Sequence, residues 1–213
     1  MLAGFTAGLL LITISELGDK TFFISAILAM RHSRRLVFLG AIGALAAMTV
    51  LSVLMGQVAS LFPEHYVRWA EMLLFFGFGL KLLHDASQML PEKPNLEEQE
   101  EAAETVMEAE VKLARAGRSN RVAAIVAQSF GLTFIAEWGD RTQFTTIALA
   151  AANDPLGVTL GAILGHAICA LIAVQCGKLV CGRISEKTIT TIGGALFLLF
   201  SMVSLSRLLG WLG

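Results

Sequence analysis

Long apolar stretches alternate with short polar connections along this chain. Six stretches rich in Leu, Ile, Val, Ala, Phe and Gly cover residues 3–30, 36–61, 66–90, 121–151, 156–181 and 188–212. A helix needs about 20 consecutive apolar residues to cross the hydrocarbon core of a bilayer. The pattern therefore predicts an all-α polytopic membrane protein with six transmembrane helices.

The second half of the chain repeats the first. When the halves are shifted by 121 positions without gaps, ELGDKT at 16–21 falls on EWGDRT at 137–142, and LGAI at 39–42 falls on LGAI at 160–163. Each half holds three predicted helices, so the second half has to enter the membrane from the opposite side. We therefore expect two inverted three-helix repeats, an architecture common among secondary transporters. The predicted units are residues 1–90, 91–120 and 121–213.

The linker at 91–120 is charged where the rest is apolar. Asn95 and Glu98 have the spacing of a capping box, and Gly117 stands where a glycine would end a helix, so a solvated helix is predicted. The loops on the linker side carry most of the basic residues, whereas Arg68 and Arg207 are the basic residues of the other side. Because basic loops stay in the cytoplasm, we expect a cytoplasmic linker and both termini outside.

Composition agrees with a membrane protein. Apolar residues make up 55% of the chain, charged residues 15%, and the mean hydropathy is +0.70. A net charge of −1 gives no reason to expect a nucleic-acid partner. The first stretch does not resemble a cleavable signal, since Glu16 interrupts its apolar core. The three cysteines contain no C-x-x-C pair, so neither a disulfide framework nor a zinc site is indicated.

Each repeat places ionisable residues in the middle of its first apolar stretch. The predicted metal-binding residues are Glu16, Asp19, Glu137 and Asp140. Since only two cations accompany these four carboxylates, two negative charges remain unmatched at a depth where each charge costs about 3 kcal/mol. Either protons or a divalent cation can neutralise them, and the two exclude one another, which is the basis of an exchange reaction. Oxygen ligands suit Ca²⁺, Mn²⁺ and Mg²⁺.

Other motif residues are assigned auxiliary parts. Lys20, Arg141, Thr21, Thr142 and Gln143 are predicted to tune or complete the site, and Gly18 and Gly139 to let the helix break. Thr21 joins the carboxylates only if such a break occurs, and otherwise bonds to a neighbouring helix; both alternatives stay open. Gln143 has Phe22 as its repeat partner, so any ligand set that includes it is asymmetric. Glu71 and His166 receive no role.

The two motifs, ELGDKT and EWGDRT, resemble the paired E-x-G-D-(K/R)-T motifs of a family of small cation/proton exchangers in the lysine-exporter superfamily. Members of that family occur in bacterial, chloroplast and Golgi membranes, and the resemblance covers both repeats. It implies a transporter that is not an enzyme, has no cofactor and exchanges Mn²⁺ or Ca²⁺ for protons through the motif acids. So short a chain is similar to bacterial members, which implies manganese export across the inner membrane.

Three alternatives remain beside manganese export. Calcium/proton exchange would use the same oxygen ligands. An intramembrane aspartyl protease would use Asp19 and Asp140 as a dyad, but a cation follows each aspartate and would remove the proton that a dyad shares. A channel is disfavoured by the inverted repeat, which is typical of alternating access. The sequence does not indicate an oligomeric state or a proton stoichiometry.

Overall fold

The computed structural model describes residues 1–89, 96–115, 122–180 and 185–210, which are almost entirely helical. The helices are α1 (Leu2–Glu16), α2 (Lys20–Arg31), α3 (Arg34–Ala59), α4 (Glu64–Gln88), α5 (Leu96–Arg115), α6 (Val122–Ala136), α7 (Arg141–Ala152), α8 (Pro155–Val180) and α9 (Glu186–Leu208). Their lengths recur along the chain: α1 to α4 have 15, 12, 26 and 25 residues, and α6 to α9 have 15, 12, 26 and 23. The charged helix α5 separates the two sets.

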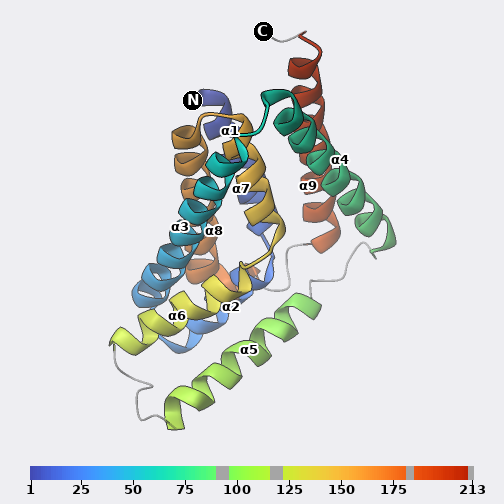
Figure 1. Cartoon of the computed structure of the whole chain (residues 1–213). Helices are drawn as coiled ribbons and strands as arrows, with labels where there is room; N and C mark the ends of the chain where they lie inside the picture. Colours follow the sequence, from blue (N-terminus) through green and yellow to red (C-terminus); the bar gives the residue numbers. More distant parts are fainter. Residues whose placement is uncertain (90–95, 116–121, 181–184, 211–213) are drawn as a thin grey trace.

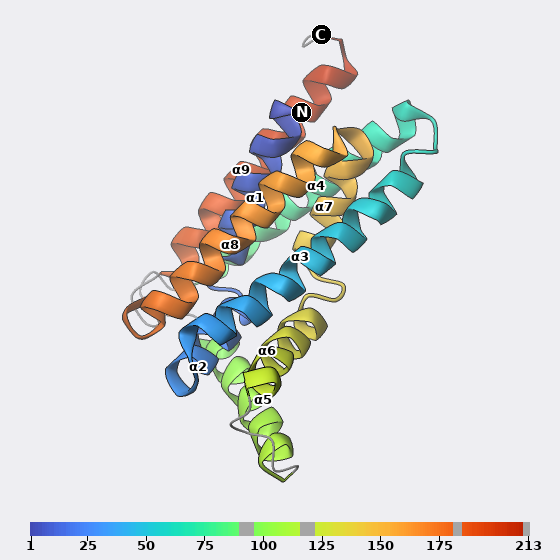
Figure 2. The same cartoon turned by 90° about the vertical axis from the view of Figure 1, so that its left-hand side faces the viewer.

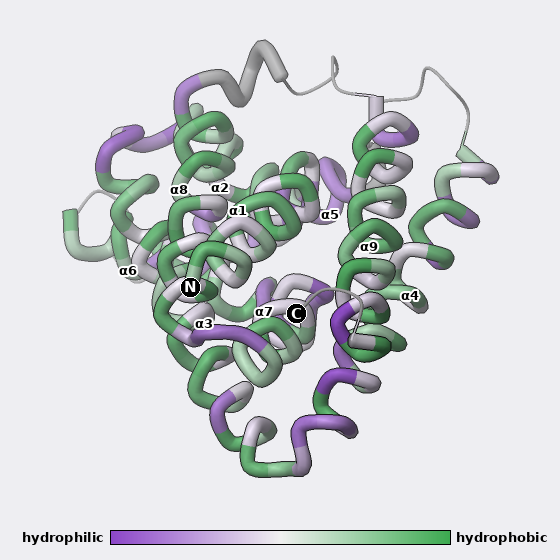
Figure 3. Tube along the Cα trace, turned by 90° about the horizontal axis from the view of Figure 1, so that it is seen from above, coloured by the Kyte–Doolittle hydropathy of each residue, from purple (hydrophilic) through white to green (hydrophobic). Residues whose placement is uncertain are grey.

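Several of the described helices are long and apolar enough to cross a membrane. Three qualify alone, namely α3, α9 and the Pro155–Gln175 part of α8, and the bent pairs α1–α2 and α6–α7 bring the number to five. The predicted third span corresponds to α4, which is not among them; Glu71, Lys81 and Asp85 lie along it. Hydrophobic residues predominate along α8 and α9 (Figure 3). The chain is thus a helical, polytopic membrane protein.

The two halves of the chain interlock through their helices. Helix α1 packs along α8, α3 along α6, and α4 along α9 (Figures 1 and 2). Small residues permit the first two approaches, because a Cβ atom on Gly161 would meet Phe5 O at 2.2 Å and one on Gly40 would meet Val126 O at 2.6 Å. Gly40 and Gly161 are repeat partners, and so are Phe5 and Val126, so the same close contact is made twice.

Neither the first nor the fourth predicted span is a single straight helix. The axis turns by 65° between α1 and α2 and by 74° between α6 and α7. The two charged motifs lie at these bends. The start of α1 and the end of α9 lie at one end of the molecule, and α5 lies at the other (Figure 1).

Helix α5 is held against α2. Ala102 and Val106 on α5 are fully buried in an apolar cluster that includes Phe22 and Phe23 of α2. Ion pairs join the exposed edges, with Lys20 Nζ 3.0 Å from Glu101 Oε2 and Arg31 beside Glu110. Exposed pairs contribute about 0–1 kcal/mol each, so apolar burial supplies most of the attachment. The predicted capping residues Asn95 and Gly117 lie outside the described residues.

Candidate functional site: carboxylates at two helix breaks

The backbone makes the same turn at both motifs. Gly18 has φ 82° and Gly139 has φ 83°, a left-handed conformation that glycine adopts far more readily than other residues. In each turn the aspartate N–H donates to the carbonyl of the glutamate three residues earlier, at 3.3 Å for Asp19 to Glu16 and for Asp140 to Glu137. The breaks place the glutamate at the end of one helix and the aspartate before the next. The glutamate and aspartate side chains of each motif therefore project from the break between two helices.

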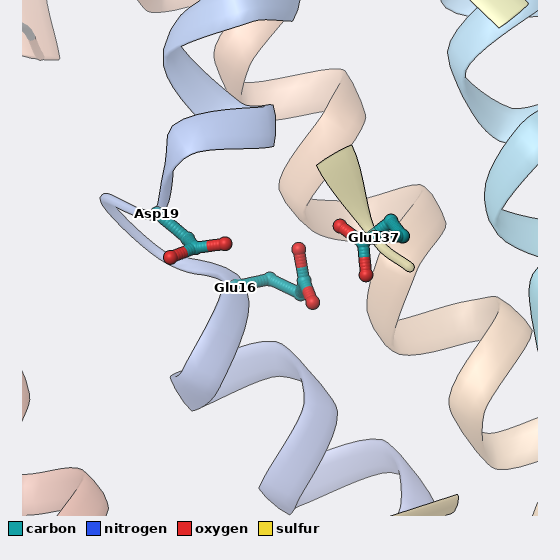
Figure 4. A group of neighbouring side chains, drawn as sticks. All are labelled: Glu16, Asp19 and Glu137. Carbon is teal, nitrogen blue, oxygen red and sulfur yellow. The ribbon is translucent and has the colours of Figure 1, made fainter. Parts of the chain in front are cut away.

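Three carboxylates from the two repeats meet between these turns. Each of Glu16, Asp19 and Glu137 offers one oxygen, and the three oxygens lie within 4.8 Å of one another. The Glu16 carboxylate lies between the other two (Figure 4). Glu16 and Glu137 are buried, with 2% and 1% of their surface exposed, whereas Asp19 is only partly covered. A divalent cation needs such a group of converging oxygens.

A threonine hydroxyl supports each buried glutamate. Thr21 Oγ1 lies 3.1 Å from Glu16 Oε2, and Thr142 Oγ1 lies 3.1 Å from Glu137 Oε2. Of the two arrangements left open by the sequence, the structure therefore has the one in which the helix breaks and the threonine reaches the acid. The other oxygen of each glutamate, Oε1, is buried and has no hydrogen-bond partner among the residues that the structure describes. Each buried glutamate thus keeps one oxygen available to a ligand.

Asp140, the fourth predicted metal-binding residue, lies outside this group of three. Its Oδ2 caps α7, 3.3 Å from the Thr142 N–H and 3.2 Å from the Thr142 hydroxyl. Asp19 holds the equivalent position before α2 but its side chain makes no cap hydrogen bond. The two motifs therefore differ in their local contacts although their sequences are alike.

The two motif cations have different surroundings. Arg141 Nη2 lies 4.0 Å from Asp19 Oδ1, in the other repeat, whereas Lys20 Nζ pairs with Glu101 on α5. Gln143 is buried; its Oε1 accepts a hydrogen bond from the Gly139 N–H at 2.8 Å, and its Nε2 lies 3.1 Å from Met48 Sδ. Arg141 is thus the cation placed beside the carboxylate group, and Gln143 braces the second turn.

Two buried polar residues without a predicted role, His166 and Glu71, also contact polar side chains in the interior. His166 Nδ1 on α8 lies 3.8 Å from Glu16 Oε1. Glu71 on α4 accepts hydrogen bonds from Ser204 at 2.7 Å and Asn153 at 3.0 Å, and Arg207 donates to Asn153 at 3.0 Å. The sequence does contain a signal for His166, because it is a single imidazole in an apolar helix and aligns with a leucine in the first half of the chain. Sequence spacing alone, however, does not indicate which residue it contacts.

A cavity of about 250 Å³ leads to the carboxylates from the side of α5. Asp19 and Arg141 line it at the breaks, and Asp85, Glu98 and Glu186 line it on α4, α5 and α9. Burial raises the pKa of the Glu98 carboxyl, and repulsion by Glu101 raises it further. Of the three converging carboxylates, Asp19 is the one that lines the cavity as the described residues outline it.

Buried carboxylates at paired helix breaks, inside a bundle of apolar helices, are features of membrane proteins that move ions. A family model described as divalent cation/proton antiporter GDT1 matches residues 4–90 and 125–209. The chain belongs to the GDT1 family of divalent cation/proton antiporters, which confirms the resemblance drawn from its two motifs. It is a transporter and not an enzyme.

Relatives are found in a cyanobacterium and in plants. A GDT1-like protein of Synechocystis sp. is 60% identical over 204 residues, which cover 96% of this chain and 97% of that protein. The chloroplastic PAM71-homolog protein of Arabidopsis thaliana is 43% identical over 93% of this chain and 58% of its own length. The chloroplastic GDT1-like protein 1 of Oryza sativa subsp. japonica is 44% identical over 95% of this chain and 61% of its own. No solved structure matches the chain.

Proposed function

We propose that this protein exports Mn²⁺ from the bacterial cytoplasm in exchange for protons, by alternating access at the group formed by Glu16, Asp19 and Glu137. One observation carries the proposal: two buried glutamates from opposite repeats each keep an unpartnered oxygen, beside an aspartate that lines an open cavity. Asp140 would act from beside this group, through the Thr142 hydroxyl that lies within 3.2 Å of Asp140 Oδ2 and 3.1 Å of Glu137 Oε2.

The chemistry of exchange follows from the charges. Three converging carboxylates carry more negative charge than the nearby Arg141 guanidinium offsets, and two of them are removed from water. Binding a divalent cation neutralises that excess, and so does protonation, so each displaces the other. Two protons per cation is the stoichiometry that conserves the charge of the site.

The proposed architecture has six transmembrane segments in two inverted repeats. The bent pairs α1–α2 and α6–α7 each form one span, α4 forms the third despite its charges, and α3, α8 and α9 form the rest. The recurring helix lengths and the twofold Gly40 and Gly161 contacts support the repeat. We place the linker in the cytoplasm and both termini outside, in the inner membrane, because the basic loops lie on the linker side.

Alternating access requires the site to open to one side at a time. The cavity reaches Asp19 from the α5 side, which is cytoplasmic in the proposed topology. At the opposite end, Glu71, Asn153, Ser204 and Arg207 join α4, α9 and the end of α7 through hydrogen bonds. In the proposed topology, an open cavity on this side together with hydrogen-bonded helices on the other would be an inward-facing state that loads a cation from the cytoplasm.

Calcium/proton exchange is the second candidate, because the three carboxylates supply the oxygen ligands that Ca²⁺ takes. A protease dyad of Asp19 and Asp140 is not retained, since the family consists of antiporters and Asp140 caps a helix.

Transport into liposomes tests the proposal. In liposomes with an imposed pH gradient, the purified protein should move Mn²⁺ in the direction opposite to the proton flux. Glu16→Gln or Glu137→Gln should reduce both fluxes by at least about tenfold, since each removes a charged ligand from a buried site. Ser201→Ala is the matched control, because it removes a buried hydroxyl that bonds Met72 O in α4, away from the carboxylates. Normal transport by either glutamine variant would refute the site.

A further inference from the structure

We infer that His166 is a nitrogen ligand of the transported cation and makes the site prefer a transition-metal ion such as Mn²⁺ over Ca²⁺. The inference rests on the proposed cation site and extends it, since the motifs themselves offer oxygen atoms alone.

Packing of α8 on α1 brings His166 to the carboxylates. A Cβ atom on Gly165 would lie 3.0 Å from Thr13 Oγ1, and Cys169 Sγ lies 3.2 Å from Thr13 O. One turn of α8 therefore rests against the turn of α1 that ends at Glu16. His166 lies between these two contacts in sequence, and its Nδ1 is 3.8 Å from Glu16 Oε1.

Within the described part of the chain, neither of the two facing atoms has a hydrogen-bond partner. Both His166 Nδ1 and Glu16 Oε1 are buried and unpartnered, and only 4% of His166 and 2% of Glu16 are exposed. A separation of 3.8 Å is too long for a hydrogen bond between them. Two ligands that each lie about 2.1–2.4 Å from one ion are separated by roughly 3–4.5 Å, so a shared cation satisfies both atoms at this spacing.

The nitrogen enters from one side of the site. The repeat partner of His166 is Leu45, which is buried and apolar, so the first repeat has no equivalent imidazole. Ca²⁺ takes oxygen ligands, whereas divalent first-row transition metals also accept imidazole, with affinity rising along the series that begins at Mn²⁺. One imidazole added to three carboxylates therefore shifts selectivity away from Ca²⁺ and leaves the oxygen group able to bind either ion.

Pulsed electron paramagnetic resonance of bound Mn²⁺ tests the assignment directly. Parent protein loaded with Mn²⁺ should show hyperfine coupling to one nitrogen, and growth with ¹⁵N-labelled histidine should convert the signal to that of ¹⁵N. His166→Gln and His166→Leu should lose the coupling, whereas His65→Gln, an equal change at an exposed histidine of α4, should keep it. Bound Mn²⁺ without nitrogen coupling in the parent protein would overturn the inference, and this measurement requires no variant to fold.

Selectivity in liposomes gives a second measurement. The ratio of Mn²⁺ to Ca²⁺ initial rates should fall at least fivefold in His166→Gln while Ca²⁺ transport persists. If the ratio is unchanged, whether both rates fall by the same factor or neither falls, His166 has a packing role and the inference fails. Failure of the proposed function is a different result, namely no transport of either ion by the parent protein.

Discussion

In Glu16 and in Glu137, one carboxylate oxygen is hydrogen-bonded to a threonine, and the other has no partner in the described ranges of the chain. A buried acceptor that loses water without gaining a partner costs roughly 1–3 kcal/mol. The threonines fix the direction of both carboxylates, so the unpartnered oxygens are held in place before a cation arrives. Preorganisation of this kind reduces the ordering cost of binding.

The two aspartates are expected to respond unequally to the same substitution. Asp19→Asn removes a charge from the group of three, and we expect Mn²⁺ to bind at least about tenfold more weakly, a loss of about 1.4 kcal/mol. Asp140→Asn should cost less, because asparagine caps helices as well as aspartate does and the side chain is outside the group. Equilibrium binding of Mn²⁺ to the purified variants measures the difference, and a larger loss in Asp140→Asn would contradict the arrangement of the site.

At the scale of the helices, the two breaks decide where the acids project. An unbroken helix from Leu2 to Arg31 would carry Thr21 about 140° around the axis from Glu16, at 100° per residue. The turn at Gly18 instead brings the Thr21 hydroxyl within 3.1 Å of that glutamate. The same is true of Thr142 and Glu137, so the site depends on backbone conformation at two glycines.

Gly139→Ala tests this dependence with little steric interference. A Cβ atom at Gly139 meets nothing within 4 Å, so its effect comes from the left-handed conformation, which costs other residues about 1–2 kcal/mol. We expect a lower melting temperature in detergent together with reduced Mn²⁺ binding. Gly131→Ala is the matched control, since a Cβ there also meets nothing within 4 Å but the residue is inside α6. Alanine should stabilise that helix by up to about 1 kcal/mol, and equal melting temperatures for the two variants would argue against strain at Gly139.

At the scale of the whole molecule, the two halves of the chain together form one carboxylate group instead of a separate group in each half. Helices of each half pack on helices of the other, and the carboxylate group draws residues from both breaks. The cavity opens to one side, and the hydrogen bonds of Glu71 and Asn153 join helices at the other. A movement that breaks these hydrogen bonds and closes the cavity would give the proposed outward-facing state.

Cysteine labelling from the two sides of the membrane tests the proposed orientation. In a background with Cys169, Cys176 and Cys181 replaced by serine, Glu104→Cys on α5 should react with an impermeant maleimide only from the cytoplasmic side. Leu61→Cys, between α3 and α4 and 83% exposed, should react only from outside. Labelling of both cysteines from the same side would exclude the inverted arrangement, and the opposite pattern would reverse the direction of loading.

The sequence alone determined that this protein is a helical membrane transporter, and it predicted the carboxylates of the proposed site. Apolar stretches of membrane length indicated a helical membrane protein, the 121-residue sequence repeat predicted two related halves, and the excess of acids over cations predicted cation binding. These features depend on composition and spacing alone. Only the tertiary structure separated Asp19 from Asp140, which have matching sequence surroundings but different contacts. It alone also placed His166 beside Glu16, because residues 150 positions apart meet only through the packing of α8 on α1.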